Sequence, residues 1–238
     1  MDYKYTGIVL SKINVGETDR IYTIYTKEAG KVRFLGKVVR KPNAKLAGSL
    51  EPLTLSEIFV AKSQGMGKIT GAIVSENFYK IKSDIDILNK INYVLKIFSK
   101  IIAEQEQDKN VFEILEGFLK SLNKLTGGKG TENKSDILMF GFLFKLLSEM
   151  GYRMEVEKCV QCQEKLKPEN NYFSAARGGV LCQNCRAMEE KRIKIGAESI
   201  KLIRIILKNK IENLTKIQVA QKDINNLKII MQETINWV

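Results

Sequence analysis

Four cysteines restrict how the second half of the chain can fold more than any other feature of the sequence. They form two matched pairs, CVQC (Cys159 and Cys162) and CQNC (Cys182 and Cys185), with 19 residues between the pairs. A two-residue gap lets both thiolates of a pair turn onto one ion, and two such pairs at this separation have the spacing of a tetrahedral zinc site. We therefore predict a four-cysteine zinc finger over residues 155–188, with one structural zinc ion as the cofactor.

The segment between the two pairs fits a hairpin. Its sequence NYFSAARGGVLC supplies a short strand, a turn at Gly178 and Gly179, and a returning strand, which is the geometry of a zinc ribbon. Four thiolates saturate the metal and leave no open position for water, so the ion would be structural rather than catalytic. Three other uses of four cysteines stay open from the spacing alone: two disulfides, a redox dithiol and an iron–sulfur cluster.

The first 80 residues have the composition and punctuation of β-strands. Segments rich in Val, Ile, Thr, Tyr and Phe alternate with short connections that carry Gly, Pro and Asn. The five predicted strands are residues 5–13, 19–26, 31–39, 53–61 and 67–75. No connection is long enough for a crossover helix, and five antiparallel strands in so short a segment fit a small barrel. We predict an OB-fold, the commonest such barrel that binds nucleic acid, over residues 1–80.

Residues 81–238 change to the helical period, so the predicted fold class is α+β: a five-stranded OB-fold β-barrel followed by an α-helical domain with an inserted four-cysteine zinc finger. Ser83 is the predicted N-cap of the first long helix. After a polar, glycine-rich linker over residues 126–135, the next helix should begin at Ser135 or Asp136 and end near Gly151. Two apolar stripes mark the helices before that linker: Ile87, Ile91, Val94, Phe98 and Ile101, then Phe112, Leu115, Phe118, Leu119 and Leu122.

A basic stretch overlaps the third predicted strand and the loop after it. No acidic residue occurs between positions 29 and 50, and the whole chain has a formal net charge of +12. This charge favours an acidic polymer or an anionic surface as partner, with nucleic acid first. Strand alternation places the cations on the outer face, whereas Val32, Phe34 and Val38 should face the barrel interior. The predicted DNA-binding residues are Lys31, Arg33, Lys37, Arg40, Lys41 and Lys45. The alternative interpretation is that these cations only form a solvated, solubilising face.

Other features narrow the function further. Tyr22 and Tyr25 either stack on bases or pack the barrel. The sequence has no histidine, which removes histidine acid/base chemistry, Ser–His nucleophiles and mixed Cys/His zinc sites. The glycine-rich GMGKITG lacks the Walker pattern, because Lys62 and Ile69 stand where Gly and Ser or Thr are needed.

The longest apolar run, residues 137–144, is too short for a membrane span, and no secretory signal is visible. We expect a cytoplasmic, soluble protein that is not an enzyme and takes no small-molecule substrate.

Two separated motifs resemble one known family. The stretch GETDRIYTIYTKEAGKVRFLGKVVRKPNAKLAGSLEPLTL resembles the N-terminal domain of the bacterial DNA repair protein RecO family, whose pattern contains G-E-x-D-R, a basic R-R-P-x-S-x-L-x-G segment and L-E-P. FSAARGGVLCQNC resembles the family's F-S-x-x-x-G-G-x-L-C-x-x-C zinc stretch. The similarity covers most of the chain in the same order. It departs from the pattern at Val38, where the family has a small residue, and at Ala44, where serine or glycine is frequent.

The resemblance implies a recombination mediator without enzymatic turnover. Members of the family bind single- and double-stranded DNA, anneal complementary strands, contact RecR and single-strand binding protein, and help load RecA. Carried over by position, Arg40, Lys41 and Lys45 occupy the family's basic segment, and Lys37 occupies the lysine that precedes it. The four cysteines occupy its zinc positions, and because some members lack them, the metal would hold the C-terminal domain together rather than serve the activity.

Two functions of other classes stay open beside this one. OB barrels and zinc ribbons also occur in RNA- and ribosome-binding modules, for which structured RNA would be the preferred partner. A protein-interaction adaptor is the other alternative, with grooves of the helical domain binding an acidic, apolar peptide tail.

Overall fold

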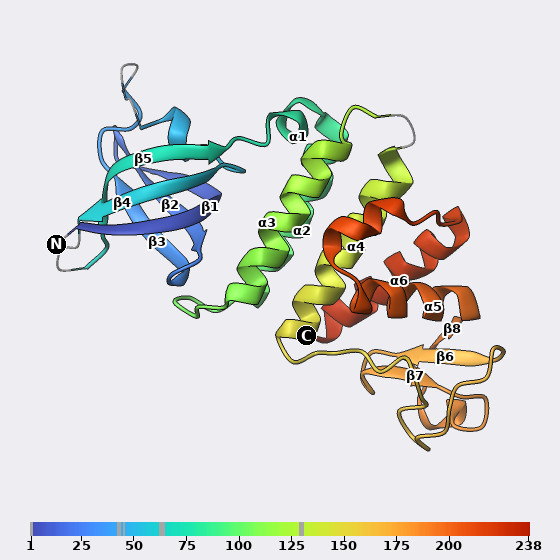
Figure 1. The fold of residues 1–238 in the computed structure, drawn as a ribbon. Coiled ribbons are helices and arrows are strands. Elements are labelled where there is room, and N and C mark those ends of the chain that lie inside the picture. The colour runs from blue at the N-terminus through green and yellow to red at the C-terminus, as the bar shows by residue number, and fades with distance from the viewer. Residues whose placement is uncertain (1, 42–43, 45, 62–64, 129–130) are drawn as a thin grey trace. The chain divides into compact units, whose positions relative to one another are not determined.

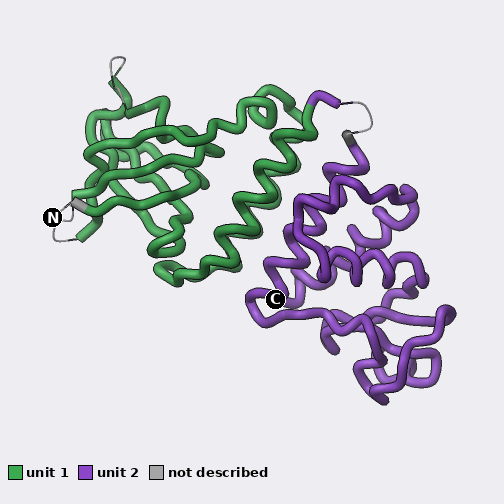
Figure 2. Tube along the Cα trace, in the orientation of Figure 1, with its two compact units in different colours: residues 1–126 green, residues 127–238 purple. Residues whose placement is uncertain are grey.

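The structure is a computed structural model that describes residues 2–41, 44, 46–61, 65–128 and 131–238. The chain divides into two compact units, residues 1–126 and 127–238 (Figure 2). The first contains a barrel and three helices, and the second contains three long helices and a small three-stranded sheet (Figure 1). In this described part of the chain, none of the helices combines the length and the apolar character that crossing a membrane requires.

The predicted five-stranded barrel is confirmed. Its strands are β1 (Asp2–Val15), β2 (Asp19–Thr26), β3 (Gly30–Gly36), β4 (Leu55–Ala61) and β5 (Lys68–Glu76). They close in the order β1-β2-β3-β5-β4, with β4 pairing back onto β1. A register shift between Val9 and Ser11 bends β1, so that its first half pairs with β4 and its second half with β2.

The barrel interior is filled by residues of one strand parity, as the alternation predicts. Tyr22 on β2 stands opposite Phe34 on β3, and both rings are buried. These side chains lie in one apolar cluster of buried residues: Val9, Tyr22, Ile24, Phe34, Val39, Leu50, Ile58, Val60 and Ile69. The cluster draws on strands β1 to β5 and on the connections after β3, which explains why the short barrel can hold a core.

The end of the third strand differs from the prediction. β3 stops at Gly36, and Val38 has a φ of 59° and is 44% exposed, so it does not face the interior. Val39 takes the buried position instead, at 2% exposure. The reason is the turn that begins after Gly36, because a left-handed residue reverses the alternation that a continuing strand would have kept.

Three helices complete the first unit: α1 (Tyr79–Ser83), α2 (Ile85–Ile101) and α3 (Lys109–Leu125). The N-cap of α2 is Asp84 rather than Ser83, because a five-residue helix takes up Ser83 and the Asp84 carboxylate accepts from the amides of Asp86 and Ile87. Asp108 caps α3 in the same way. The predicted apolar stripes are buried, apart from Ile101, which is half-buried.

The second unit is built on α4 (Thr131–Glu149), α5 (Ala197–Lys208) and α6 (Gln221–Trp237). Helix α4 begins four residues before the predicted Ser135, and Ser135 donates its hydroxyl to the carbonyl of Glu132 inside the helix. It ends before Gly151, which has the positive φ of 86° expected at a helix terminus. Between α4 and α5 lies the sheet β7-β6-β8, with β6 (Asn171–Ser174), β7 (Gly179–Leu181) and β8 (Ile193–Ile195).

The predicted domain boundary between residues 80 and 81 stays a prediction. Helices α1 to α3 belong to the same compact unit as the barrel, since the ring of Tyr25 on β2 lies edge-on to Phe98 of α2, with 5.0 Å between ring centroids. The first compact unit therefore extends to residue 126, past the barrel itself.

Candidate metal centre and nucleic-acid interface

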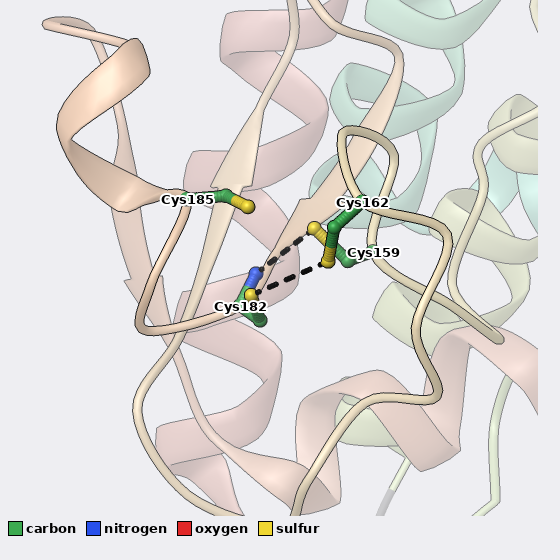
Figure 3. Close-up of side chains that lie close together, drawn as sticks. All are labelled: Cys159, Cys162, Cys182 and Cys185. Atoms are coloured by element: carbon green, nitrogen blue, oxygen red, sulfur yellow. Dashed lines mark hydrogen bonds between the residues drawn. The ribbon is translucent and has the colours of Figure 1, made fainter.

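The four cysteines converge on one point (Figure 3). Their Sγ atoms all lie within 4.8 Å of one another, and Cys162 Sγ is 3.8 Å from Cys182 Sγ. A tetrahedral ion with bonds of about 2.3 Å to sulfur requires neighbouring sulfurs to be about 3.8 Å apart. All four thiols are free, and Cys159 and Cys185 are buried. The residues present therefore fit a closed, four-thiolate metal site.

Hydrogen bonds prepare one thiol of the cluster for ionisation. Burial by itself raises the pKa of Cys159, but backbone amides of Cys162, Cys182 and Gln161 donate toward its sulfur and together lower that pKa to about 6. The amide of Cys182 lies 3.4 Å from Cys159 Sγ. Burial and the neighbouring thiols instead raise the pKa of Cys185. Amides stabilise the Cys159 thiolate, and its charge opposes ionisation of Cys185, so a divalent cation is needed before all four sulfurs can be thiolates.

The local fold follows from two glycines and a backbone ladder. Gly178 has a φ of 68° in the turn between β6 and β7. At Gly179 a Cβ would overlap the carbonyl oxygen of Glu155, which the amide of Val180 approaches at 3.0 Å. The amide of Val160 donates to the Val180 carbonyl at 2.9 Å, so the first cysteine knuckle is tied to β7. The predicted hairpin between the cysteine pairs is confirmed.

The predicted DNA-binding cations lie in several environments. Arg33, Lys37, Arg40 and Lys41 are exposed on β3 and on the loop after it, whereas Lys45 lies outside the described residues. Lys31 is half-buried, and its ammonium donates to the carbonyl of Ser99 at 2.7 Å and to that of Ile102. Cationic side chains stabilise the C-terminal end of a helix, so Lys31 caps α2. No sequence pattern pointed to this partner.

The segment after β3 that carries Lys37, Arg40 and Lys41, called the basic loop below, contacts the turn between β1 and β2 through Val38 and Arg40. The amide of Val38 donates to the Asp19 carboxylate at 2.8 Å, and the amide of Arg40 donates to the Thr18 carbonyl at 3.0 Å. The Arg40 guanidinium donates to the Gly16 carbonyl at 2.9 Å. The Val38 amide, followed by the Thr18 hydroxyl, lowers the pKa of Asp19. At neutral pH these bonds hold Val38 and Arg40 against the β1–β2 turn, and protonation of Asp19 in acid weakens the acceptor of the Val38 amide.

Replacement of Val38 by glycine is expected to stabilise the first unit. Val38 has a φ of 59°, and a β-branched residue in the left-handed region is strained by about 1–2 kcal/mol. Because glycine adds unfolded-state entropy, we expect a net gain of about 0.5–1 kcal/mol in the free energy of unfolding, measured by urea denaturation. Val39→Gly is the matched control and should be destabilising, since Val39 is buried. A loss of stability in Val38→Gly would contradict the assigned backbone conformation.

The structure decides between the two interpretations of the tyrosines. Tyr22 and Tyr25 are fully buried and are not available for stacking on bases. Tyr22 packs inside the barrel, and Tyr25 packs the barrel against α2 and α3. Tyr25 also lies against Phe98 and Phe112, and burial raises its pKa.

The second unit has an apolar groove, a feature that the adaptor alternative expected in the helical domain without naming its residues. Two adjoining cavities of about 260 and 460 Å³ share the side chains of Phe173 and Trp237. Trp237, near the end of α6, is 54% exposed, and Tyr152 at the other side of the first cavity is 44% exposed. The lining also carries charges of both signs: the cations Arg153, Arg177, Lys191 and Arg192, and the carboxylates Glu189 and Glu233. Arg177 is ion-paired with Glu189, at 3.6 Å. The only sequence signal for this groove was the lone tryptophan itself.

Comparison with known proteins accounts for the whole chain. The family descriptions that match are "Recombination protein O N terminal" over residues 1–78 and "Recombination protein O C terminal" over residues 82–237. The DNA repair protein RecO of Dehalococcoides mccartyi is 28% identical over 100% of this chain and 90% of its own length. The proteins of the same name from Acetivibrio thermocellus and Caldicellulosiruptor saccharolyticus are each 30% identical, over 98% and 99% of this chain and 90% and 92% of their own lengths.

Proposed function

The chain belongs to the RecO family of DNA repair proteins, and on this premise we propose that it is a recombination mediator that anneals complementary strands and helps load RecA. Family membership supports a role in DNA repair and recombination. The observation that carries the finer proposal is the exposure of three cations in the basic loop after β3, Lys37, Arg40 and Lys41, of which Arg40 is bonded through its amide to the turn between β1 and β2. We propose this loop and Arg33 as the DNA contact, for single and double strands alike.

The proposed mechanism needs only electrostatics. Cations of the loop neutralise phosphates and release the ions condensed on DNA, which lowers the repulsion between two strands. Base pairing then supplies the free energy of annealing. No nucleophile, base or open metal position is required, and we propose that the protein has no enzymatic turnover and acts in the cytoplasm.

We propose one zinc ion per chain at the cysteine cluster. Cys159, Cys162, Cys182 and Cys185 would hold it, and four thiolates fill its coordination sphere. When bound, zinc would supply a cross-link between the two knuckles of the ribbon rather than a reactive water.

A second function is favoured by the groove around Trp237. Aromatic and apolar side chains line the groove, and cations outnumber carboxylate side chains around it by four to two. This excess of positive charge suits an acidic, apolar peptide, and we propose that the tail of single-strand binding protein docks there. This adaptor role would bring the mediator to coated DNA. RecR is the other partner that we propose, and RecA would be reached indirectly through the loading step.

Annealing of complementary oligonucleotides, bare and coated with single-strand binding protein, tests both roles together. The wild-type protein should anneal both, whereas Trp237→Ala should anneal bare strands normally and coated strands poorly. Loss of an aromatic anchor of this kind removes about 2 kcal/mol or more of binding, which is about 30-fold in the affinity for the isolated tail peptide. Fluorescence anisotropy with labelled peptide measures this affinity.

The matched control is Ile229→Ala, which truncates another exposed apolar residue of α6 at 48% exposure. Equal losses for both variants would contradict a specific tail site. Preference for structured RNA over single-stranded DNA, with no annealing, would favour the RNA-binding alternative and overturn the mediator role.

A further inference from the structure

The connection between α2 and α3 is a short acidic segment that reaches the barrel (Figure 1). It runs over residues 102–108, IAEQEQD, and carries three carboxylates, and we call it the acidic strap. Strand β3 pairs with β5 only at Leu35, so within the described residues the first half of β3 presents an edge that β5 does not cover. The strap lies on that edge. Glu104 forms a parallel bridge with Lys31, and the amide of Gln105 donates to the Lys31 carbonyl at 2.9 Å.

Further contacts fix the backbone of the strap. A Cβ at Gly30 would overlap the carbonyl oxygen of Glu106, so only glycine permits this approach, and its φ of +63° also favours glycine. The side-chain amide of Gln107 donates to the Lys27 carbonyl at 3.0 Å. The Tyr25 hydroxyl donates to the Asp108 carbonyl at 3.4 Å. The backbone of the strap is thus packed against β2, β3 and the turn between them.

The strap engages both cations that face outward from β3. The Lys31 ammonium binds carbonyls at the end of α2, as described above. Arg33 makes a two-point contact with Glu104, with 3.2 Å from Nε to Oε1 and 3.3 Å from Nη2 to Oε2. Both side chains of this pair are about half exposed, at 52% and 53%. Paired contacts of this geometry are how guanidinium groups also bind phosphate.

We propose that Glu104 is a built-in phosphate mimic, which occupies Arg33 in the place of a DNA phosphate and so lowers the affinity of the barrel for DNA. The proposal rests on the proposed DNA contact and deepens it. An exposed ion pair is weak and screened by salt, so a phosphate can replace the carboxylate without moving the strap backbone. Lys31 stays engaged, because its partners are backbone carbonyls. A polyanion that already contacts Lys37, Arg40 and Lys41 presents its next phosphate at high local concentration, whereas an isolated anion does not.

Glu104→Gln tests this proposal directly. Arg33 should then be free to bind one more phosphate of a labelled single-stranded oligonucleotide. One added contact steepens the slope of log affinity against log salt by about 0.7, which is about a fivefold gain in affinity at 0.1 M salt. In the Arg33→Ala background, Glu104→Gln should give no such gain, because the cation that the mimic occupies is absent.

The matched control is Glu116→Gln on α3, which removes the same charge from another exposed ion pair, with Lys120 at 2.7 Å. It should leave both affinity and slope unchanged. Unchanged or weaker binding by Glu104→Gln, a gain that persists without Arg33, or an equal gain in the control would each overturn the proposal. Absence of DNA binding by the wild-type protein would instead remove the proposed function on which it rests.

Discussion

Zinc removal is expected to unfold the cysteine-bearing ribbon of the second unit. Structural zinc binds small cysteine sites with apparent free energies of about 10–16 kcal/mol, which is comparable to the whole stability of a typical domain. The apolar cluster beside the cysteines is small, consisting of Leu181 with partly buried Val160, Leu166 and Tyr172. It cannot replace such a cross-link. Cys159→Ser, which also removes the most readily ionised thiol, should therefore lose the metal and admit protease within residues 155–188.

Elemental analysis and limited proteolysis measure this outcome. Wild-type protein purified without chelator should hold one equivalent of zinc, and a strong chelator should reproduce the Cys159→Ser pattern. Lower pH should also release the metal, since protons compete for the thiolates. Asn184→Ser, inside the second cysteine pair but not a ligand, is the matched control and should keep its zinc. Four free thiols without zinc in an intact ribbon would contradict the site, and bound iron would favour the cluster alternative.

The features that the sequence predicted well are those that depend on neighbours along the chain. Strand alternation correctly put Phe34 inside the barrel and Arg33 outside, because pleating is a local property of the backbone. The spacing of the cysteines and the glycine pair at 178 and 179 predicted the hairpin for the same reason. The apolar stripes of the helices were predicted correctly over several turns, whereas the N-cap of α2 is Asp84, one residue after the predicted Ser83.

The features that the sequence could not predict depend on partners far along the chain. The parity of Lys31 indicated its direction, but its acceptors Ser99 and Ile102 come from the end of α2. Glu104 likewise meets Arg33 only because the connection after α2 returns to the edge of β3. The inward turn of Val39 depends on a left-handed Val38, which valine itself disfavours. Among the described residues of the basic stretch, Lys31 is thus bonded to backbone carbonyls and Arg33 is ion-paired, whereas Lys37, Arg40 and Lys41 are exposed.

Simultaneous replacement of Arg40 and Lys41 by alanine is expected to weaken single-stranded DNA binding about 25-fold at 0.1 M salt, because each lost phosphate contact flattens the salt slope by about 0.7. Both side chains are exposed on the loop that follows β3. Arg40 uses one donor on the Gly16 carbonyl, and a guanidinium has five, so it can bind a phosphate from the same position. Annealing of bare strands should fall with affinity. Salt titrations of binding to a labelled oligonucleotide measure both quantities.

The control for this pair is Lys96→Ala with Lys100→Ala, which removes two exposed cations of α2 in the same unit and so changes net charge equally. If the position of the cations determines DNA affinity, this control should keep the wild-type slope of log affinity against log salt. The reason is that a phosphate contact needs a cation placed along the path of the strand. If net charge alone attracts DNA, both double variants should lose affinity alike. The loop backbone should survive in Arg40→Ala, since its amide still donates to the Thr18 carbonyl, so an unchanged slope in a folded variant would remove the loop from the DNA contact.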